Sequence, residues 1–161
     1  MKCLFALLQL FLIFQIVLNS SLLSSANKAL MNNEQAAQNT GTLTNDQILL
    51  SKNQNYYVKM QSDGNFVLYS NGSTNGKGSD NAIWASGSNG KGKGPYRLEV
   101  QSSGYLVLYD SNNVSLWVNY TSSGIGVAPF LLVVQNNGDL QTLDSSNPPK
   151  VNWSLGTAGR Q

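Results

Sequence analysis

The segment from Gln61 to Tyr69 carries the side chains best suited to hold a small polar molecule. An amide side chain both donates and accepts hydrogen bonds, a carboxylate accepts them, and a phenol offers a hydroxyl group. A sugar presents the complementary surface, with hydroxyl groups around apolar C–H groups. On alternation alone, the solvated outer face of an antiparallel sheet is the more common explanation. The candidate residues stand at alternate positions: Gln61, Asp63, Asn65, Val67 and Tyr69.

A β-hairpin with a three-residue loop is the element that would place these side chains together. The Asp-Gly pair lies between two apolar runs, and Gly64 is predicted to adopt the left-handed conformation. This geometry sets Met60 opposite Phe66, whereas a two-residue loop would mix apolar and polar side chains on each face. The inner face then reads Val58, Met60, Phe66 and Leu68, and the outer face reads Tyr57, Lys59, Gln61, Asn65, Val67 and Tyr69.

The motif Gln61-x-Asp63-x-Asn65-x-Val67-x-Tyr69 resembles the mannose-binding signature of the bulb-type, or monocot mannose-binding, lectins. The resemblance extends over about residues 41–157. It implies an all-β fold of the β-prism II type, with three four-stranded antiparallel sheets related by pseudo-threefold symmetry. It also implies that Gln61, Asp63, Asn65 and Tyr69 hydrogen-bond to mannose hydroxyls while Val67 packs on the sugar ring.

Two further copies of the hairpin support a threefold architecture. Segments equivalent to the one at Gln61 start at Gln101 and Gln135, so the spacings are 101 − 61 = 40 and 135 − 101 = 34 residues. The inner pattern recurs as Leu98, Val100, Leu106, Leu108 and as Leu132, Val134, Leu140, Thr142. Each copy also has a loop glycine and a later tryptophan, which predicts a central aromatic cluster; these residues are Gly64, Gly104, Gly138, Trp84, Trp117 and Trp153.

The outer positions of the second and third copies depart from the motif. In the second copy a serine replaces the acid and a tyrosine replaces the small amide; its residues are Gln101, Ser103, Tyr105, Val107 and Tyr109. In the third copy the acid and amide are exchanged, and the valine and tyrosine are lost; its residues are Gln135, Asn137, Asp139, Gln141 and Leu143. We therefore expect one working mannose site and two that are dead or altered.

The N-terminal region has the pattern of a secretory signal. Residues 1–26 combine Lys2, an apolar run and small residues before a cleavage point, and the run is short for a membrane span. We expect residues 27–40 to be a flexible lead-in and residues 41–161 to form one domain, with repeats at 41–88, 89–122 and 123–157. Cys3, the single cysteine, lies in the signal. These features predict a secreted protein without a stable membrane anchor.

Several other features bear on the extracellular expectation. The sequence has glycosylation sequons at Asn71, Asn113, Asn119 and Asn152, of which Asn152 adjoins a core tryptophan and is the poorest candidate. The loop at 71–81 is expected to be solvated or, less favoured, to rim the intact site. The resemblance further implies that homodimers could form by exchange of the C-terminal strand around 151–156.

Composition argues against other functional classes. The chain has no histidine, and Asp63 has no evident acidic companion, so an enzyme, a metal site and a cofactor are not expected. A net charge of +2 leaves little electrostatic footprint for nucleic acid. The alternatives to a secreted mannose-binding protein are a structural or protein-interaction module without useful sugar binding, and a defence toxin that acts on a protein target.

Overall fold

The computed structural model describes residues 41–72, 78–120 and 126–160, and this part of the chain is all-β. Residues 1–26, predicted to be a signal, residues 27–40, predicted to be a lead-in, and residues 73–77 of the 71–81 loop lie outside the described residues. No helix in the described part is long and apolar enough to span a membrane. The strands are β1 (Thr42–Thr44), β2 (Ile48–Leu50), β3 (Tyr56–Met60), β4 (Phe66–Ser70), β5 (Asn81–Ala85), β6 (Arg97–Val100), β7 (Leu106–Tyr109), β8 (Ser115–Val118), β9 (Leu131–Val134), β10 (Leu140–Leu143) and β11 (Val151–Ser154).

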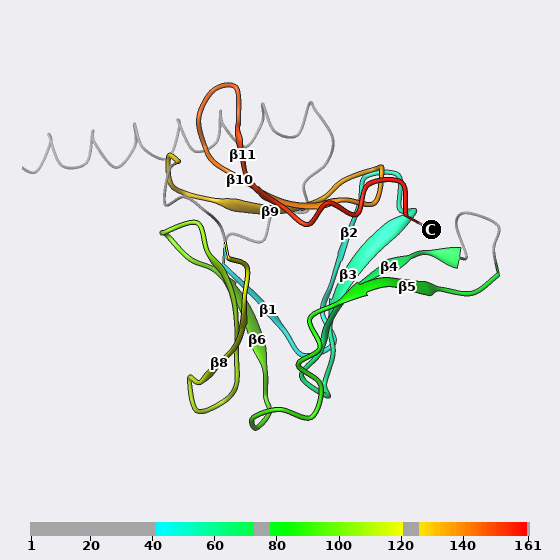
Figure 1. Cartoon of the computed structure of the whole chain (residues 1–161), viewed down its shortest axis with the longest axis vertical. Coiled ribbons are helices and arrows are strands. Elements are labelled where there is room, and N and C mark those ends of the chain that lie inside the picture. The colour runs from blue at the N-terminus through cyan, green and yellow to red at the C-terminus, as the bar shows by residue number, and fades with distance from the viewer. Residues whose placement is uncertain (1–40, 73–77, 121–125, 161) are drawn as a thin grey trace, which may run out of the picture. The chain divides into compact units, whose positions relative to one another are not determined.

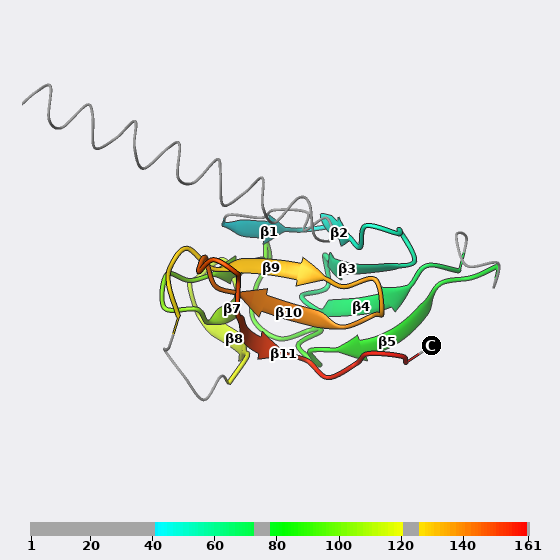
Figure 2. The same ribbon diagram turned by 90° about the horizontal axis from the view of Figure 1, so that it is seen from above.

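These strands form three antiparallel sheets that lie around a common core (Figures 1 and 2). The first sheet has the order β2-β3-β4-β5, the second β1-β6-β7-β8, and the third β11-β10-β9. The three-sheet architecture is confirmed, but the expectation of four strands in every sheet is corrected, because the third sheet has three within the described residues. The segment at 42–50 supplies an outer strand to two sheets, and β1 therefore leaves its own repeat to pair with β6.

The first hairpin has the expected register. Met60 pairs with Phe66 and Val58 with Leu68, and the amide of Gln61 donates to the carbonyl of Asn65 across the loop. All four inner side chains of this hairpin are completely buried. The same inner phase is buried in the other two hairpins, apart from the partly buried Val100. The alternation therefore directs one set of side chains from each hairpin into a common core, as the sequence predicts. Some side chains of the opposite phase are buried as well, namely Val67, Val107, Leu131 and Val133.

The three tryptophans meet as expected. Trp117 lies between the other two, with ring centroids 5.4 Å from Trp84 and 6.4 Å from Trp153, both in edge-to-face contact. Phe66 extends the cluster, with its ring 6.2 Å from Trp84. Edge-to-face pairs at these distances are favourable aromatic contacts. One residue from each repeat therefore helps to join the sheets at the centre.

The loop glycines make a second, more peripheral set of contacts between sheets. Gly64, Gly104 and Gly138 all have left-handed backbones, with φ of 89°, 85° and 84°. Each also lies against an aromatic ring of another repeat, so that an added Cβ would come within about 3 Å of that ring. The pairs run in one direction around the molecule, from first repeat to second, second to third, and third to first: Gly64 with Tyr96, Gly104 with Phe130, and Gly138 with Tyr56.

Candidate functional site

On the outer face of the first sheet, Gln61 and Tyr69 of the predicted site contact each other. Gln61 Nε2 donates to the Tyr69 hydroxyl at 2.7 Å, although the two residues are eight positions apart. Tyr57, the cross-strand neighbour on β3, stacks on the Tyr69 ring with centroids 5.0 Å apart and an angle of 16°. The phenol is thus fixed at its hydroxyl and across one ring face. A fixed hydroxyl loses little conformational freedom when it meets a ligand.

Asn65 is held by a segment that sequence reasoning did not identify. Its Oδ1 accepts hydrogen bonds from Ser86 Oγ at 3.0 Å, the Gly87 amide at 3.1 Å and the Ser88 amide at 3.3 Å. Ser88 is itself buried and donates to the carbonyl of Gly64 at 2.7 Å. Because Oδ1 is occupied in this way, the side-chain amide nitrogen of Asn65 is the group left to meet a ligand.

Asp63 and Val67 differ in how much surface they offer. Asp63 is exposed at the loop, and its Oδ1 accepts the backbone amide of Asn65 at 2.9 Å. Val67, expected to present an apolar surface to a sugar ring, is only 2% exposed. Val67 lies on a central strand, with Lys59 and Ala85 as its cross-strand neighbours. It therefore forms a small apolar floor rather than an open contact surface.

Asp80 lies closer to this face than the sequence suggested. Its Oδ2 accepts the Tyr57 hydroxyl at 2.8 Å, and its Oδ1 accepts the Gly72 amide at 3.0 Å. Burial and the hydrogen bond to Asp80 both raise the pKa of the Tyr57 phenol well above its usual range, so the hydroxyl stays protonated. Asp80, at the described end of the 71–81 loop, thus contacts Tyr57, which stacks on Tyr69. This contact favours the expectation that the loop borders the predicted sugar site over the expectation that it is only solvated. The described residues contain no group of acidic, cysteine or histidine side chains arranged to bind a metal ion.

The second sheet keeps half of this arrangement. Gln101 Nε2 donates to the Tyr109 hydroxyl at 2.8 Å, as Gln61 does to Tyr69. Ser103 donates to Gln101 Oε1 at 3.3 Å and offers no carboxylate, and the Tyr105 ring occupies the position of the small amide. Val107 is 4% exposed, like its counterpart in the first sheet. The face therefore lacks the acid and amide of the intact copy.

In the third sheet, the polar side chains of the outer face hydrogen-bond to one another. Asp139 is 4% exposed, and its Oδ1 accepts the amides of Gly156 at 2.9 Å and Thr157 at 3.1 Å. Its Oδ2 accepts Ser154 Oγ at 2.6 Å and Gln141 Nε2 at 2.9 Å. Gln135 donates to Gln141 at 3.0 Å, while Asn137 accepts the Asp139 amide, and Leu143 replaces the tyrosine. Asp139 thus accepts two consecutive backbone amides, as Asn65 does in the first sheet. Both of its oxygens already have partners, so neither is left for a ligand.

Two carboxylates that the sequence analysis did not single out organise the loops after the hairpins. Asp110 follows β7 and accepts the amides of Val114, Asn112 and Lys93; its pKa is lowered chiefly by the Val114 hydrogen bond. Asp144 follows β10 in the same way; burial opposes its ionisation, but hydrogen bonds from Ser146, Lys150 and Val127 outweigh this and lower its pKa. The sequence signal for this role is that both aspartates directly follow the second strand of their hairpin. The first copy obscures it, because Ser70 stands there instead.

Ser70 is completely buried, and its Oγ has no partner among the described residues. We expect Ser70→Ala to raise the free energy of unfolding by about 1 kcal/mol, because it removes an unpaired buried hydroxyl. Ser51 offers a matched control, since it is 2% exposed but its Oγ accepts the Tyr56 amide at 3.0 Å. Ser51→Ala should lower stability by about 1 kcal/mol. Urea denaturation of both variants tests the pair, and a loss of stability in Ser70→Ala would contradict the assignment.

The glycosylation candidates differ in accessibility. Asn113 is exposed, and Asn71 is half-buried with its Nδ2 donating to the Gln54 carbonyl at 2.9 Å. Asn119 is 2% exposed, and its Oδ1 accepts the amide of Leu106. The expectation of a glycan at Asn119 is therefore corrected, because a buried side chain that completes the sheet leaves no room for one. Asn71 and Asn113 stay predictions.

Solved structures of plant lectins resemble this fold. Monomeric monocot mannose-binding lectins from Gastrodia elata share 31% identity, with 73% of this chain and 92% of theirs covered and a TM-score of 0.57. A lectin from Allium sativum shares 28% identity, with 70% and 92% covered and a TM-score of 0.53. The Polygonatum cyrtonema lectin, solved with a monomannoside, shares 28%, with 77% and 96% covered and a TM-score of 0.52.

A comparison with curated proteins adds a relative outside plants. Comitin from Dictyostelium discoideum is 40% identical over 78 residues, which make up 48% of this chain and 42% of Comitin. The match thus spans less than half of the length of that protein. No family model matches the chain. On the fold and the identity to the Gastrodia elata lectins, the chain belongs to the bulb-type, monocot mannose-binding lectin family. Membership of this family supports carbohydrate binding in general.

Proposed function

We propose that the protein binds D-mannose or mannose-rich glycans through one site on the outer face of the first sheet. The observation that carries the proposal is the complete set of Gln61, Asp63, Asn65 and Tyr69 on that face, held in place by bonds to their surroundings. The monocot lectins that resemble the chain support the choice of sugar, since they are mannose-binding proteins. The role is binding rather than catalysis.

The hydrogen bonds within the site leave a distinct set of groups for a ligand. Among the described residues, no partner is present for Gln61 Oε1, Asp63 Oδ2, Asn65 Nδ2 or the hydroxyl hydrogen of Tyr69. Two acceptors and two donors can therefore meet adjacent sugar hydroxyls, each of which both donates and accepts. Val67 lies beneath them as the apolar floor.

The affinity for a single sugar should be weak. The face is open, and mannose gives up a strong hydration shell on binding, so we expect a Kd of about 1 mM. With one working site per chain, strong attachment to a glycan-coated surface would need several chains acting together. This makes the stoichiometry of binding as informative as the affinity.

We expect Asn65→Asp to weaken binding of methyl α-mannoside by about tenfold or more, because it replaces the amide donor with a charged acceptor. The substitution keeps the oxygen that accepts hydrogen bonds from the segment 86–88. Asp139 shows that an aspartate fits the equivalent position of the third sheet. Ser103→Ala, at the position in the second sheet equivalent to Asp63, is the control and should leave mannose binding unchanged. Titration calorimetry of the purified protein measures both.

The outcomes separate the candidate functions. Binding at about one site per chain, weakened by Asn65→Asp alone, supports the proposal. A stoichiometry near three would mean that the second and third faces also bind mannose. If the folded protein gives no heat with methyl α-mannoside or a mannotriose, the mannose proposal fails and a protein-interaction module is favoured.

We further propose that the protein acts outside the cell. The support is the charged start, apolar run and small residues of the segment at 1–26, together with a mature chain that would contain no cysteine. Expression of the full chain in a eukaryotic host, followed by N-terminal sequencing of protein from the medium, tests this. A start near residue 27 is expected, whereas retention of the full chain in cells would contradict it.

A further inference from the structure

The outer face of the second sheet contains a pre-arranged polar cluster that the loss of the mannose motif does not explain. Gln101 and Tyr109 keep the hydrogen bond of the intact copy, at 2.8 Å against 2.7 Å. Arg97 takes the position of Tyr57, and its guanidinium lies 4.7 Å from the centroid of the Tyr109 ring. A cation over a ring face is an attractive contact, so the tyrosine is again covered on one side.

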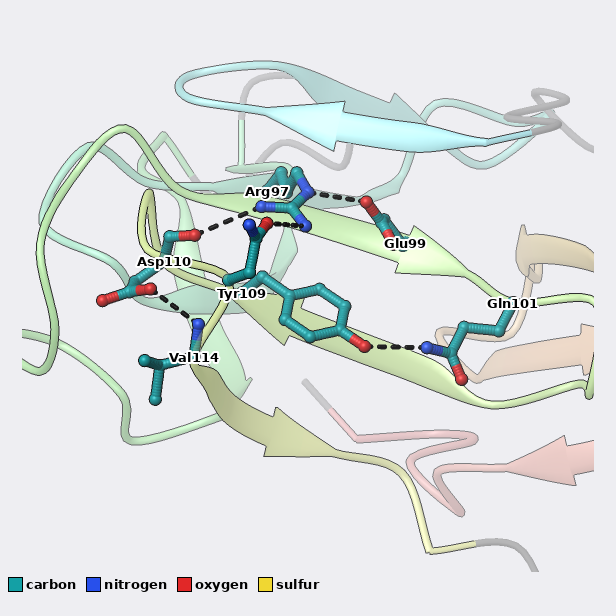
Figure 3. Close-up of polar contacts among 7 residues, drawn as sticks. Arg97, Glu99, Gln101, Tyr109, Asp110 and Val114 are labelled. Atoms are coloured by element: carbon teal, nitrogen blue, oxygen red, sulfur yellow. Dashed lines mark hydrogen bonds and ion pairs between the residues drawn. The ribbon is translucent and has the colours of Figure 1, made fainter.

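Three acceptors hold Arg97 in this position (Figure 3). Its Nε donates to Glu99 Oε1 at 2.6 Å, its Nη1 to the Asp110 carbonyl at 3.2 Å, and its Nη2 to Asn113 Oδ1 at 2.8 Å. The Arg97 and Glu99 side chains are still 28% and 32% exposed. A long side chain fixed in this way at the surface has already lost the conformational freedom that binding would remove.

The remaining hydrogen-bonding groups define the chemistry of a ligand. A guanidinium has five N–H donors, of which three are used, so one remains on each terminal nitrogen of Arg97 within the described part of the chain. Glu99 Oε2 and the hydroxyl hydrogen of Tyr109 also have no partner there. Donors on one side and a carboxylate oxygen on the other suit adjacent sugar hydroxyls. The half-buried Tyr105, whose carbonyl accepts the Gln101 amide at 2.8 Å, offers an aromatic ring next to Gln101.

Charge and residue identity narrow the class of sugar. Arg97 and Glu99 form an ion pair, so the face carries no net charge that would attract an anionic ligand. The acid and small amide of the mannose motif are replaced by Ser103 and Tyr105, so mannose is not the expected ligand. The third face gives the contrast: both oxygens of Asp139 are occupied, and Gln135 and Gln141 bond to each other.

We propose that the outer face of the second sheet is a separate binding site for a neutral hexose other than mannose. Arg97, Glu99 and Tyr109 bind adjacent hydroxyls, Gln101 positions Tyr109, and Tyr105 packs on the ring of the sugar. This site goes beyond the proposed mannose function and does not depend on it, because it uses a different sheet.

The test is NMR titration of ¹⁵N-labelled protein that carries Asp63→Asn, a change that disables the first face but keeps the acceptor for the Asn65 amide. The probes are methyl glucoside, methyl galactoside, N-acetylglucosamine, methyl mannoside and sodium glucuronate, each at up to about 50 mM. A neutral probe other than mannoside should shift the amides of residues 97–109. Glu99→Gln, which keeps an acceptor for Arg97, should weaken that binding about tenfold.

Three results would overturn the proposal. One is the absence of shifts at residues 97–109 with every neutral probe other than methyl mannoside, while the tryptophan signals show a folded protein. The second is a response to glucuronate alone, and the third is binding that Glu99→Gln leaves unchanged. The first result would mean that Arg97 only fastens the loop at Asp110 and Asn113. Failure of the mannose proposal is scored separately, on the protein with an intact first face.

Discussion

Replacement of Gly138 by alanine is expected to lower the free energy of unfolding by about 3 kcal/mol. Two costs add at this position. The backbone has a φ of 84°, where an L side chain costs about 1 kcal/mol. The new Cβ would also lie 2.7 Å from Tyr56 Cε1 and 3.0 Å from two more ring atoms, and the ring is buried and cannot move aside freely. Overpacking of this kind typically costs about 1–3 kcal/mol.

Gly156→Ala separates the two costs. Gly156 has a similar φ of 73°, but an added Cβ would meet nothing within 4 Å. We expect it to lose about 1 kcal/mol, from the backbone alone. Urea denaturation followed by tryptophan fluorescence measures both variants. Equal losses would show that the ring contact at Gly138 does not matter, and the account of inter-sheet contacts would then be wrong.

The second large effect is expected at Asp139, where alanine should lower the free energy of unfolding by about 3 kcal/mol. Its carboxylate accepts the amides of Gly156 and Thr157 and the hydroxyl of Ser154, at distances from 2.6 to 3.1 Å. Alanine would leave these donors without their acceptor; the Thr157 amide is buried, whereas Ser154 and Gly156 are exposed and can bond to water instead. Each such loss costs about 1–3 kcal/mol when the donor stays buried.

Asp139→Asn is the matched variant, because the first sheet uses Asn65 for the same backbone bonds. We expect a loss of about 1 kcal/mol, since one side-chain oxygen is kept. A stability equal to that of Asp139→Ala would contradict the assignment of the backbone bonds to Oδ1. A stability equal to that of the parent would show that the carboxylate's second oxygen contributes nothing.

Acid should reveal the charge of Asp139. Burial opposes its ionisation, but the hydrogen bonds from Ser154, Gln141, Thr157 and Gly156 outweigh it and hold the pKa below the usual 3.8. The unfolded chain therefore takes up a proton first, and the stabilisation present above the usual pKa is lost as the pH falls through 3.8 and towards the folded value. Asp139→Asn should lose less stability than the parent between about pH 6 and about pH 3.

The sequence was sufficient to predict the parts of the fold that repeat with a fixed period. The alternation of apolar and polar residues around Gly64 predicted the pairing of Met60 with Phe66. The threefold repetition of the hairpin and its tryptophan predicted the three sheets and the tryptophan cluster. The candidate sugar-binding residues could be named from the sequence because they stand at alternate positions of one hairpin, and their role in mannose binding stays a prediction. Local spacing determines such relations, so a single chain is enough to infer them.

The parts that were missed depend on contacts between distant segments. Ser86 to Ser88 fix Asn65 from more than 20 positions away, and nothing in their composition marks them as partners. The pairing of β1 with β6 likewise joins segments of different repeats. The burial of Val67 depends on side chains of neighbouring strands, which alternation does not specify.

The glycine–aromatic contacts have a consequence for how the chain folds. In a linear array of repeats, an end unit can unravel while its neighbours stay intact. Here the contacts close on themselves, because Gly64 meets Tyr96, Gly104 meets Phe130, and Gly138 returns to Tyr56. Among the described repeats none is an end unit in this set of contacts, and loss of one repeat would remove a contact from each of the other two. We therefore expect the three repeats to unfold together. Residues on the outer faces can change without breaking these contacts, whereas loss of a whole repeat cannot be tolerated.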